Sequence, residues 1–390
     1  MSKPQNCLLG DLIEFQRGYD LPKSKFVHGK YPVQSSNGIL GYHHEYKVKA
    51  PSITIGRSGT VGTPHLIKTN FFPHNTALFV KDFKGNDVEY IYYLLKNLKL
   101  NEYKTGSGVP TMNRNHLHPL KIQAFLGIPT QKSIAHILST LDQKIAINNQ
   151  INAQLEQMAK TLYDYWFVQF DFPDENGKPY KSSGGEMVYN DTLKREIPKG
   201  WEVKSLWSIA KYFNGLSLQK YRPKNEYGDF LPVIKIREMN EGISANTEKA
   251  STEIPKEAII NDGDILFSWS ATLDVKIWTQ GKGALNQHIF KVTSNQYPKS
   301  FYYFELLNYL QHFKMMAELR KTTMGHITQD HLKQAFICIP SDALLSGLDQ
   351  ILSPIFQKII ILKKQNQQLA QLRDFLLPML MNGQVGVDGG

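Results

Sequence analysis

Two stretches of the chain carry the same apolar stripe. Its members are three and four residues apart in alternation, a spacing that keeps one helix face against a partner helix. The first stripe comprises Ile134, Leu138, Leu141, Ile145, Asn148, Asn152, Leu155, Ala159, Leu162 and Trp166. The second comprises Leu348, Leu352, Ile355, Ile359, Leu362, Asn366, Leu369, Arg373, Leu376 and Leu380, each 214 residues after its counterpart. The pattern predicts two long helices that pair with each other.

We expect these helices over residues 130–170 and 341–382. Asparagine occupies the matched positions Asn152 and Asn366. A buried Asn lowers the stability of a coiled coil but fixes its register, so we assign that role to this pair. Ser353-Pro354 resembles an N-cap followed by proline at the first helical position, which predicts a short helix over 342–352 before the long one.

The segments that precede the helices repeat as well. SITIGRSGTVG (52–62) aligns with DILFSWSATLD (264–274), and both halves reach their helix through Ile-Pro. Near the start of each half, a short amphipathic helix is predicted to end at Gly18 or Gly215, in the C′ position that favours glycine. The chain is therefore predicted to be a duplication of one globular domain plus one helix.

The duplication gives a complete division of the chain. We expect globular domains over 1–129 and 201–340, a linker rich in turn-forming residues over 171–200, and a frayed tail over 383–390. A chain of 390 residues is long for one core, which agrees with two domains.

Composition favours a soluble, intracellular protein with a polyanionic partner. The net charge is +10, and residues 1–130 alone hold 16 Lys and Arg against 8 Asp and Glu. Such an excess attracts polyanions. Cys7 and Cys338 have no partner spacing, which fits a reducing compartment, and the N-terminal segment lacks a signal-peptide pattern. We therefore expect a cytoplasmic location.

Polar loops differ between the two halves where the framework is shared. Lys and Arg favour phosphates and guanine, whereas Asn and Gln favour adenine, so these loops are candidate DNA contacts. The candidates of the first half are Ser36, Asn37, Arg57, Ser58, Thr60, Lys104 and Ser107. Those of the second half are Lys235, Arg237, Asn240, Trp269, Ser270, Lys321 and Thr322. Two similar readers with different loops suggest two different half-sites.

Over nearly its whole length the chain resembles the specificity subunits of type I restriction-modification enzymes. The resemblance rests on the duplicated layout, the LGDL opening, Ser36-Asn37-Gly38, Gly56-Arg57-Ser58-Gly59, Asn286-Gln287-His288-Ile289 and the Ile-Pro helices. It implies an α+β fold in which two long helices form an antiparallel coiled coil between two globular α/β target-recognition domains, with a pseudo-twofold internal repeat. Each domain would recognise one half of a split site in double-stranded DNA.

The resemblance also implies partners. Two modification (methyltransferase) subunits would dock on this non-catalytic subunit, together with restriction/translocase subunits and without a membrane. S-adenosylmethionine, ATP and Mg would act in those partners, and this chain would hold no cofactor or metal. In agreement, the sequence contains no G-x-x-x-x-G-K-[ST] loop and no Asn/Asp-Pro-Pro-aromatic tetrapeptide.

Each interpretation has a simpler competitor. Arg57 could be a surface arginine in a tight turn, the Lys235–Asn240 segment a solvated strand edge, and Trp269 a half-buried packing residue. We expect His288 to be structural, bonded to the backbone. His43, His44, His116 and His118 lack a third ligand for a metal. The competing functions are a self-contained DNA methyltransferase or nuclease with an unrecognised site, and a coiled-coil scaffold.

Overall fold

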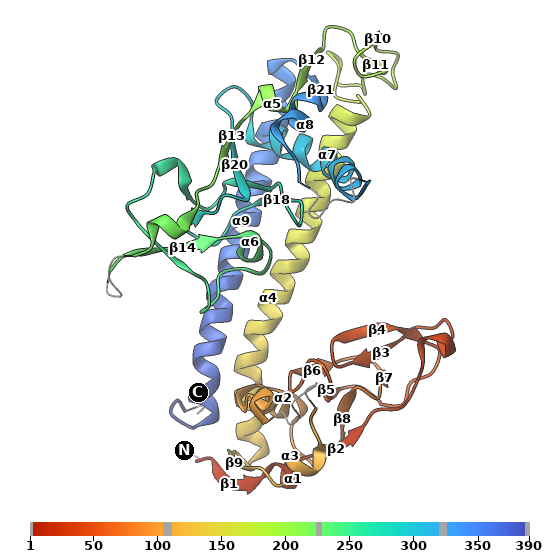
Figure 1. Cartoon of the computed structure of the whole chain (residues 1–390). Coiled ribbons are helices and arrows are strands. Elements are labelled where there is room, and N and C mark those ends of the chain that lie inside the picture. Colours follow the sequence, from red (N-terminus) through yellow and green to blue (C-terminus); the bar gives the residue numbers. More distant parts are fainter. Residues whose placement is uncertain (1–2, 104–110, 224–227, 320–325, 387–390) are drawn as a thin grey trace. The chain divides into compact units, whose positions relative to one another are not determined.

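The computed structural model describes residues 3–103, 111–223, 228–319 and 326–386. Its contacts divide the chain into two units, of which unit 1 contains residues 1–146 and 367–390 and unit 2 contains residues 147–366. The long helices α4 (Ile128–Tyr163) and α9 (Asp342–Met381) each contribute residues to both units (Figure 1).

Unit 1 contains three sheets among its described residues. The strand orders are β1-β9, β2-β8-β5-β6 and β4-β3-β7. The strands are β1 (Gln5–Leu8), β2 (Glu14–Arg17), β3 (Tyr31–Ser35), β4 (Gly38–His43), β5 (Ser52–Gly56), β6 (Pro64–Ile67), β7 (Phe72–Pro73), β8 (Ala77–Asp82) and β9 (Lys121–Ala124). The shorter helices are α1 (Leu9–Leu12), α2 (Val88–Asn97) and α3 (Arg114–Leu117), with 3-10 turns η1 (Lys23–Lys25) and η2 (Leu100–Tyr103).

Unit 2 repeats this arrangement with β12-β21, β13-β20-β17-β18 and β15-β14-β19-β16, and adds the hairpin β10-β11. The strands are β10 (Met187–Asn190), β11 (Arg195–Pro198), β12 (Glu202–Ser205), β13 (Lys211–Asn214), β14 (Phe230–Ile234), β15 (Lys249–Ser251), β16 (Ile259–Ile260), β17 (Ile265–Ser268), β18 (Asp274–Ile277), β19 (Gly283–Leu285), β20 (Ile289–Thr293) and β21 (Phe336–Ile339). The helices are α5 (Leu206–Ile209), α6 (Ile236–Glu241), α7 (Lys299–Leu319) and α8 (Gln329–Gln334), with short turns η3 (Asp164–Val168, a π-helix), η4 (Leu218–Tyr221) and η5 (Lys256–Ala258).

Strand register confirms the predicted duplication. In unit 1 Gly56 of β5 pairs with Ala77 of β8. In unit 2 Ser268 of β17 pairs with Ile289 of β20, with both partners shifted by 212 residues. The parallel pairs β3·β7 and β14·β19 are also equivalent. One folded framework therefore occurs twice.

The prediction of short helices ending at Gly18 and Gly215 is wrong beyond their first turn. Each segment forms a four-residue helix, α1 or α5, and then a strand, β2 or β13. A β-carbon at Gly18 would lie 2.1 Å from the carbonyl oxygen of His74, and one at Gly215 would lie 2.2 Å from that of Asn286. Glycine is required because two backbones meet there, and neither residue has a left-handed φ.

Both apolar stripes lie in the cores of the units. In unit 1 Ile134 and Leu138 of α4 share a core with Leu380 of α9, and in unit 2 Ala159 shares one with Leu352. In unit 2 Asn148 contacts Asn366 and Glu156 contacts Lys363, so the chains run in opposite directions. The predicted antiparallel helix pair is thus present in the packing of each unit.

The predicted break at Ser353-Pro354 is wrong, because α9 is continuous from Asp342 to Met381. Proline inside a helix removes one hydrogen bond and costs about 3 kcal/mol. Pro354 itself is exposed, whereas its neighbours Leu352 and Ile355 are buried in the core. Burial of this face on both sides of the proline offsets the local cost and keeps the helix intact.

The asparagines pair differently from the prediction. Asn366 accepts a hydrogen bond from Asn148 Nδ2 at 2.9 Å and donates one to Asn149 Oδ1 at 2.8 Å. Asn152 is buried, and its side-chain nitrogen and oxygen have no hydrogen-bond partner in the described part of the chain. The assignment of Asn152 and Asn366 as one register pair is corrected, since the antiparallel register brings Asn366 beside Asn148 instead.

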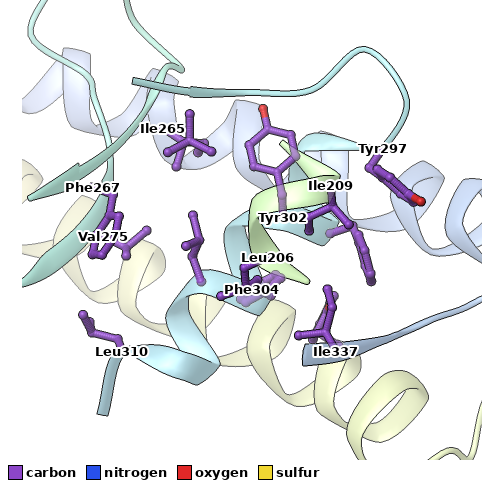
Figure 2. Packing of buried hydrophobic residues seen from close by; sticks show 14 of the residues in the cluster. Leu206, Ile209, Ile265, Phe267, Val275, Tyr297, Tyr302, Phe304, Leu310 and Ile337 are labelled. Atoms are coloured by element: carbon purple, nitrogen blue, oxygen red, sulfur yellow. The ribbon is translucent and has the colours of Figure 1, made fainter. Parts of the chain in front are cut away.

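Aromatic residues at the end of α4 belong to the core of unit 2. Tyr163 and Phe167 are buried and pack against Phe301 of α7, with ring centroids 6.4 and 6.1 Å away. Figure 2 shows side chains of the same core, with Phe304 of α7 beside Leu206 and Phe267 beside Val275. Tyr165 is the exception, because it is exposed.

Helix α9 is apolar enough, by length and composition alone, to cross a membrane. Its best 18-residue window has a mean hydropathy of 1.2, and 28% of that window is buried. The residues that make it apolar include Leu348, Leu352 and Ile359, which lie in the core of unit 2. Packing in that core accounts for their apolar character.

Candidate nucleic-acid interface

The loop between β5 and β6 is the best-supported contact loop of unit 1. The backbone N–H of Arg57 donates to the carbonyl of Thr76 at 2.8 Å, and the carbonyl of Arg57 accepts from Met112 N–H at 2.8 Å. Ser58 forms a backbone bridge with Thr111. A β-carbon at Gly56 would lie 1.7 Å from the carbonyl oxygen of Thr60, so glycine is necessary for this tight loop.

The turn between β3 and β4 joins the same site. Ser36 is buried, and its N–H donates to Thr76 Oγ1 at 3.3 Å, whereas Asn37 is exposed. Gly59 lies near the Ser36 hydroxyl, because a β-carbon there would be 3.8 Å from it. Thr60 is exposed. The structure therefore brings Ser36, Asn37, Arg57, Ser58 and Thr60 together around Thr76.

The side chain of Arg57 is half-buried at the base of this loop. Its Nη1 donates to the carbonyl of Asn75 at 3.5 Å, and no carboxylate among the described residues pairs with it. A guanidinium without a carboxylate partner keeps its donors and charge free for an anion or a base edge. The structure thus leaves Arg57 chemically able to contact DNA.

The equivalent loop of unit 2 has the same backbone frame and different side chains. Trp269 N–H donates to the carbonyl of His288 at 3.4 Å, Ile327 N–H donates to the carbonyl of Trp269 at 2.8 Å, and Ser270 bridges to His326. Trp269 occupies the place of Arg57, and Ser270 that of Ser58. One frame therefore presents a cation in unit 1 and an indole in unit 2.

Trp269 is half-buried, as the simpler interpretation proposed. Its Nε1 donates to Asn214 Oδ1 at 3.0 Å, and its ring lies 5.9 Å from that of Phe290. The hydroxyl of Ser270 is 3.2 Å from His288 Nδ1. The expected backbone partner of the His288 ring is therefore replaced by a hydroxyl. Part of the indole face remains available to a sugar or base.

Residues Lys235, Arg237 and Asn240 lie on a short helix, α6, rather than on a strand edge or a loop. The Glu238 carboxylate accepts from the backbone N–H of Lys235 at 3.2 Å, which caps the helix, and Gly242 ends it with φ 93°. These local bonds favour a helical turn over the extended conformation that was expected.

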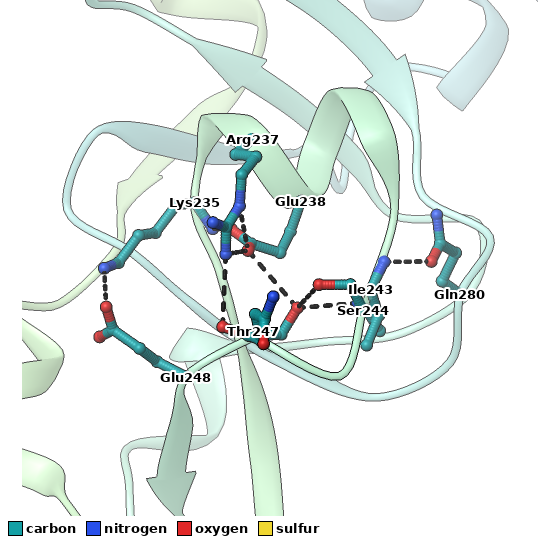
Figure 3. Close-up of polar contacts among 9 residues, drawn as sticks. Lys235, Arg237, Glu238, Ile243, Ser244, Thr247, Glu248 and Gln280 are labelled. Carbon is teal, nitrogen blue, oxygen red and sulfur yellow. Dashed lines mark hydrogen bonds and ion pairs between the residues drawn. The ribbon is translucent and has the colours of Figure 1, made fainter. Parts of the chain in front are cut away.

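The cations on α6 already have carboxylate partners. Figure 3 shows Lys235 paired with Glu248, and Arg237 Nε donating to the buried Glu238 at 2.9 Å. Glu238 raises the pKa of Arg237 through this hydrogen bond. Asn240 Oδ1 accepts from Lys276 at 2.7 Å. Of the described candidate cations, only Arg57 is without a carboxylate partner in the described residues, so Lys235 and Arg237 become weaker candidates for phosphate contacts.

The comparison with known families decides the identity. The model of the type I restriction modification DNA specificity domain matches residues 1–157 and again residues 198–371. The chain belongs to this family. It is a DNA sequence-specificity subunit of the type I restriction-modification class, as the sequence resemblance predicted, and the two matches coincide with the two copies of the fold.

Curated relatives and a solved structure agree. The type I restriction enzyme MjaIX specificity subunit of Methanocaldococcus jannaschii is 28% identical over 312 residues, which cover 77% of this chain and 69% of the relative. The HindI specificity subunit of Haemophilus influenzae is 25% identical over 316 residues, which cover 67% and 69%. The S subunit of a type I restriction-modification system from M. genitalium has the same fold, with a TM-score of 0.60 at 16% identity over 97% of this chain and 96% of that one.

Several residue assignments of this specificity subunit stay predictions. Lys104, Ser107, Lys321 and Thr322 lie outside the described residues. The family match concerns whole domains and does not test single contacts. The sequence analysis also overlooked Asn214, which holds Trp269, and Lys276, which holds Asn240. The repeat was the available signal for Asn214, because it directly precedes Gly215 as Arg17 precedes Gly18.

The histidines considered as metal ligands have structural partners in two cases. His43 Nδ1 accepts from Val27 N–H at 3.1 Å, and His118 Nε2 accepts from Phe15 N–H at 3.0 Å. Burial lowers the pKa of His118 and so favours the neutral ring that can accept. Within the described residues, no group of three or more His, Cys, Asp or Glu is placed to hold a metal ion.

Proposed function

We propose that this specificity subunit recognises a bipartite, asymmetric DNA target, with one half-site for each recognition domain. The observation that carries the proposal is the pair of equivalent loops with different chemistry, Arg57 in unit 1 and Trp269 in unit 2, on matching backbone hydrogen bonds. An arginine donates to base edges and phosphates, whereas an indole offers mainly a packing face. Equivalent frames with unlike side chains select unlike sequences.

Genomic methylation mapping tests this function directly. The genome of a strain that contains the partner subunits is mapped with and without this chain. We expect the chain to add one methylated motif composed of two defined segments separated by an undefined spacer. An uninterrupted motif, or a palindromic one, would contradict the assignment of different half-sites to the two domains.

The proposal includes two modification subunits that dock on the helix pair. In both helices we define the outer row as the residues directly before Leu138, Ile145, Ala159 and Trp166 and their counterparts in α9. These are Ile137, Lys144, Met158, Tyr165, Ile351, Lys358, Leu372 and Met379. They match pairwise at the offset of 214 residues. Such flanking positions of a coiled coil ordinarily carry charged side chains, so six apolar members out of eight call for another explanation.

The outer row is exposed where the opposite flank is covered. Asp142 and Asp349, on the opposite flank, accept hydrogen bonds from Tyr93 of α2 at 2.7 Å and Ser300 of α7 at 2.6 Å. In contrast, large apolar side chains of the outer row are exposed: Ile137, Met158, Tyr165, Ile351 and Leu372. Unit 1 contains one half of the row (Ile137, Lys144, Leu372, Met379), and unit 2 contains the equivalent half. Two equivalent apolar surfaces support two copies of one partner.

Catalysis belongs to the partners in this proposal. Modification subunits would use S-adenosylmethionine, restriction/translocase subunits would use ATP and Mg, and the assembled complex would methylate adenine and cleave DNA in the cytoplasm. Incubation of the purified chain with a labelled methyl donor and target DNA tests the division of labour. Methyl transfer by the chain alone would instead establish the competing self-contained methyltransferase.

A further inference from the structure

Unit 1 contains a cavity of about 650 Å³ that the recognition loops do not account for. It lies between β6, α2 and the helix pair, and the β3–β4 hairpin forms part of its wall. Its lining includes Gln34, Gly38, Ile39, His65, Lys68, Glu89, Tyr92, Tyr93, Lys96, Ser139, Asp142, Gln143 and Arg373. Gly38 and Ile39 directly follow the exposed Asn37, so the cavity adjoins the site built around Thr76.

The charges that line the cavity are paired with one exception. Arg373 contacts Asp142 at 2.6 Å, and Lys68 contacts Glu89 at 2.9 Å. Lys96 is half-buried and makes no ion pair with any described residue; the ring of Tyr92, 5.9 Å away, is its nearest aromatic contact. A partly desolvated ammonium without a counter-charge is unfavourable. Burial accordingly lowers the pKa of Lys96.

The duplicated framework does not require this polar cavity. At the 212- and 214-residue offsets, Tyr92 and Asp142 correspond to Phe304 and Phe356 of unit 2. Those two rings pack with centroids 5.7 Å apart, and both are buried. Lys96 corresponds to Asn308, so unit 2 lacks the cation as well. An aromatic core therefore satisfies the same architecture, and the polar groups of unit 1 serve another purpose.

We propose that this cavity binds a phosphate of the DNA backbone beside the half-site of unit 1. Lys96 supplies the charge, while the Tyr92 hydroxyl and the Gln143 amide, for which no protein hydrogen bond is found within the described residues, supply donors. Contacts of this kind fix the position of a protein on DNA without selecting sequence. The inference rests on the proposed DNA recognition, and it assigns unit 1 an anchoring site next to its base-contacting loops.

Salt-dependent DNA binding by the full-length chain tests the inference. Affinities of wild type and Lys96→Gln are measured against KCl concentration, on the target duplex and on a duplex with the first half-site scrambled. We expect Lys96→Gln to weaken both duplexes by the same several-fold factor, and to reduce the slope of log K against log salt by about 0.9. Lys96→Arg restores the slope, and Lys81→Gln, an exposed lysine of β8, leaves affinity and slope unchanged.

Two further arms separate the other outcomes. Gln143→Glu, at an exposed position of α4, adds negative charge to the cavity wall and is expected to weaken DNA binding even if Lys96→Gln does not fold. Titration of the chain with inorganic phosphate shows whether the site serves a free anion: phosphate binding that Lys96→Gln abolishes, with DNA affinity unchanged, overturns the backbone assignment. Unchanged slopes for Lys96→Gln and Gln143→Glu overturn it too. Sequence-selective binding by these variants would leave the proposed function intact.

Discussion

At the scale of single residues, Arg57 carries the sharpest consequence of the recognition model. Its guanidinium is without a carboxylate partner in the described residues and lies at the loop that the second domain replaces with Trp269. Arg57→Ala is expected to weaken binding to the target by about 1–3 kcal/mol. The same change should relax selectivity for the first half-site while the second half-site is discriminated as before.

Fluorescence anisotropy with duplexes altered in one half-site at a time measures both effects. Lys81→Ala removes a positive charge from an exposed position of the same unit and serves as the control for net charge. Equal losses on all duplexes for Arg57→Ala would indicate a phosphate contact. No loss at all would favour the scaffold interpretation of the chain.

Glu305 makes the stability of unit 2 depend on pH. Burial raises its pKa from 4.5 to about 7, and the Tyr163 hydroxyl donates to its Oε1 at 2.6 Å. Because the folded-state pKa is the higher one, the folded state binds the proton more tightly than the unfolded state. The stabilisation is fully present below pH 4.5 and is lost as the pH rises towards 7.

Glu305→Gln keeps an acceptor for Tyr163 and removes the titration. We expect the variant to gain about 2–3 kcal/mol in free energy of unfolding relative to wild type between pH 4.5 and pH 8. Urea unfolding across this range provides the measurement, and Glu257→Gln, an exposed residue of the same unit, is the control. A difference between variant and wild type that does not change with pH would show that Glu305 is ionised in the folded state.

At the scale of elements, local pattern predicted what local physics determines. The alternation of three and four residues identified both long helices, because their apolar faces are set by periodicity alone. The helix after Ser353-Pro354 was misjudged because proline signals a helix start locally, whereas burial of Leu352 and Ile355 keeps α9 continuous. Gly18 and Gly215 were recognised as necessary, but their reason lies in the backbones of His74 and Asn286, far along the sequence.

The recognition loops were predictable as loops and only partly as sites. Arg57 and Ser58 stand out by composition, and the structure gathers them with Ser36. The carboxylates that occupy Lys235 and Arg237 were not evident, because Glu248 and the capping role of Glu238 depend on the fold of α6. The unpaired Lys96 was equally hidden, since only the folded unit places it away from acidic residues in a cavity.

The outer row gives a prediction for the helices as elements. Ile351→Glu in unit 2 and Leu372→Glu in unit 1 each place a charge in one of the two apolar surfaces, which would cost a partner several kcal/mol on docking. Each single variant is expected to retain one modification subunit, and the double variant none. Native mass spectrometry of the co-expressed complex measures the stoichiometry.

Gln157→Glu, on the solvent-exposed face of α4 opposite the stripe, is the matched control and should bind two copies. Its effect separates local charge from a general loss of helix stability. Loss of both copies in either single variant would show that the two halves of the outer row act as one surface. Retention of both copies in the double variant would place the docking site elsewhere.

At the scale of the whole molecule, the duplication assigns selectivity and spacing to different parts. Half-site sequences depend on the loops of the two domains, while the distance between half-sites depends on the long helices. Inserting three heptads at equivalent positions of α4 and α9, after residues 151 and 365, preserves the stripes. The insertion lengthens each helix by about 32 Å, at about 1.5 Å for each residue. One turn of DNA advances about 34–36 Å, so the half-sites stay on the same face of the duplex.

Methylation mapping of the lengthened subunit is expected to return both original half-sites, with a spacer longer by about nine or ten base pairs. The same 21 residues inserted into the linker, between Gly184 and Gly185, should leave the motif unchanged, because that segment is outside both helices. A single heptad in each helix adds about 10 Å. That displacement rotates one half-site away from the shared face, and methylation should fall sharply. An altered half-site, or an unchanged spacer after the three-heptad insertion, would refute the role of the helices as the determinant of spacing.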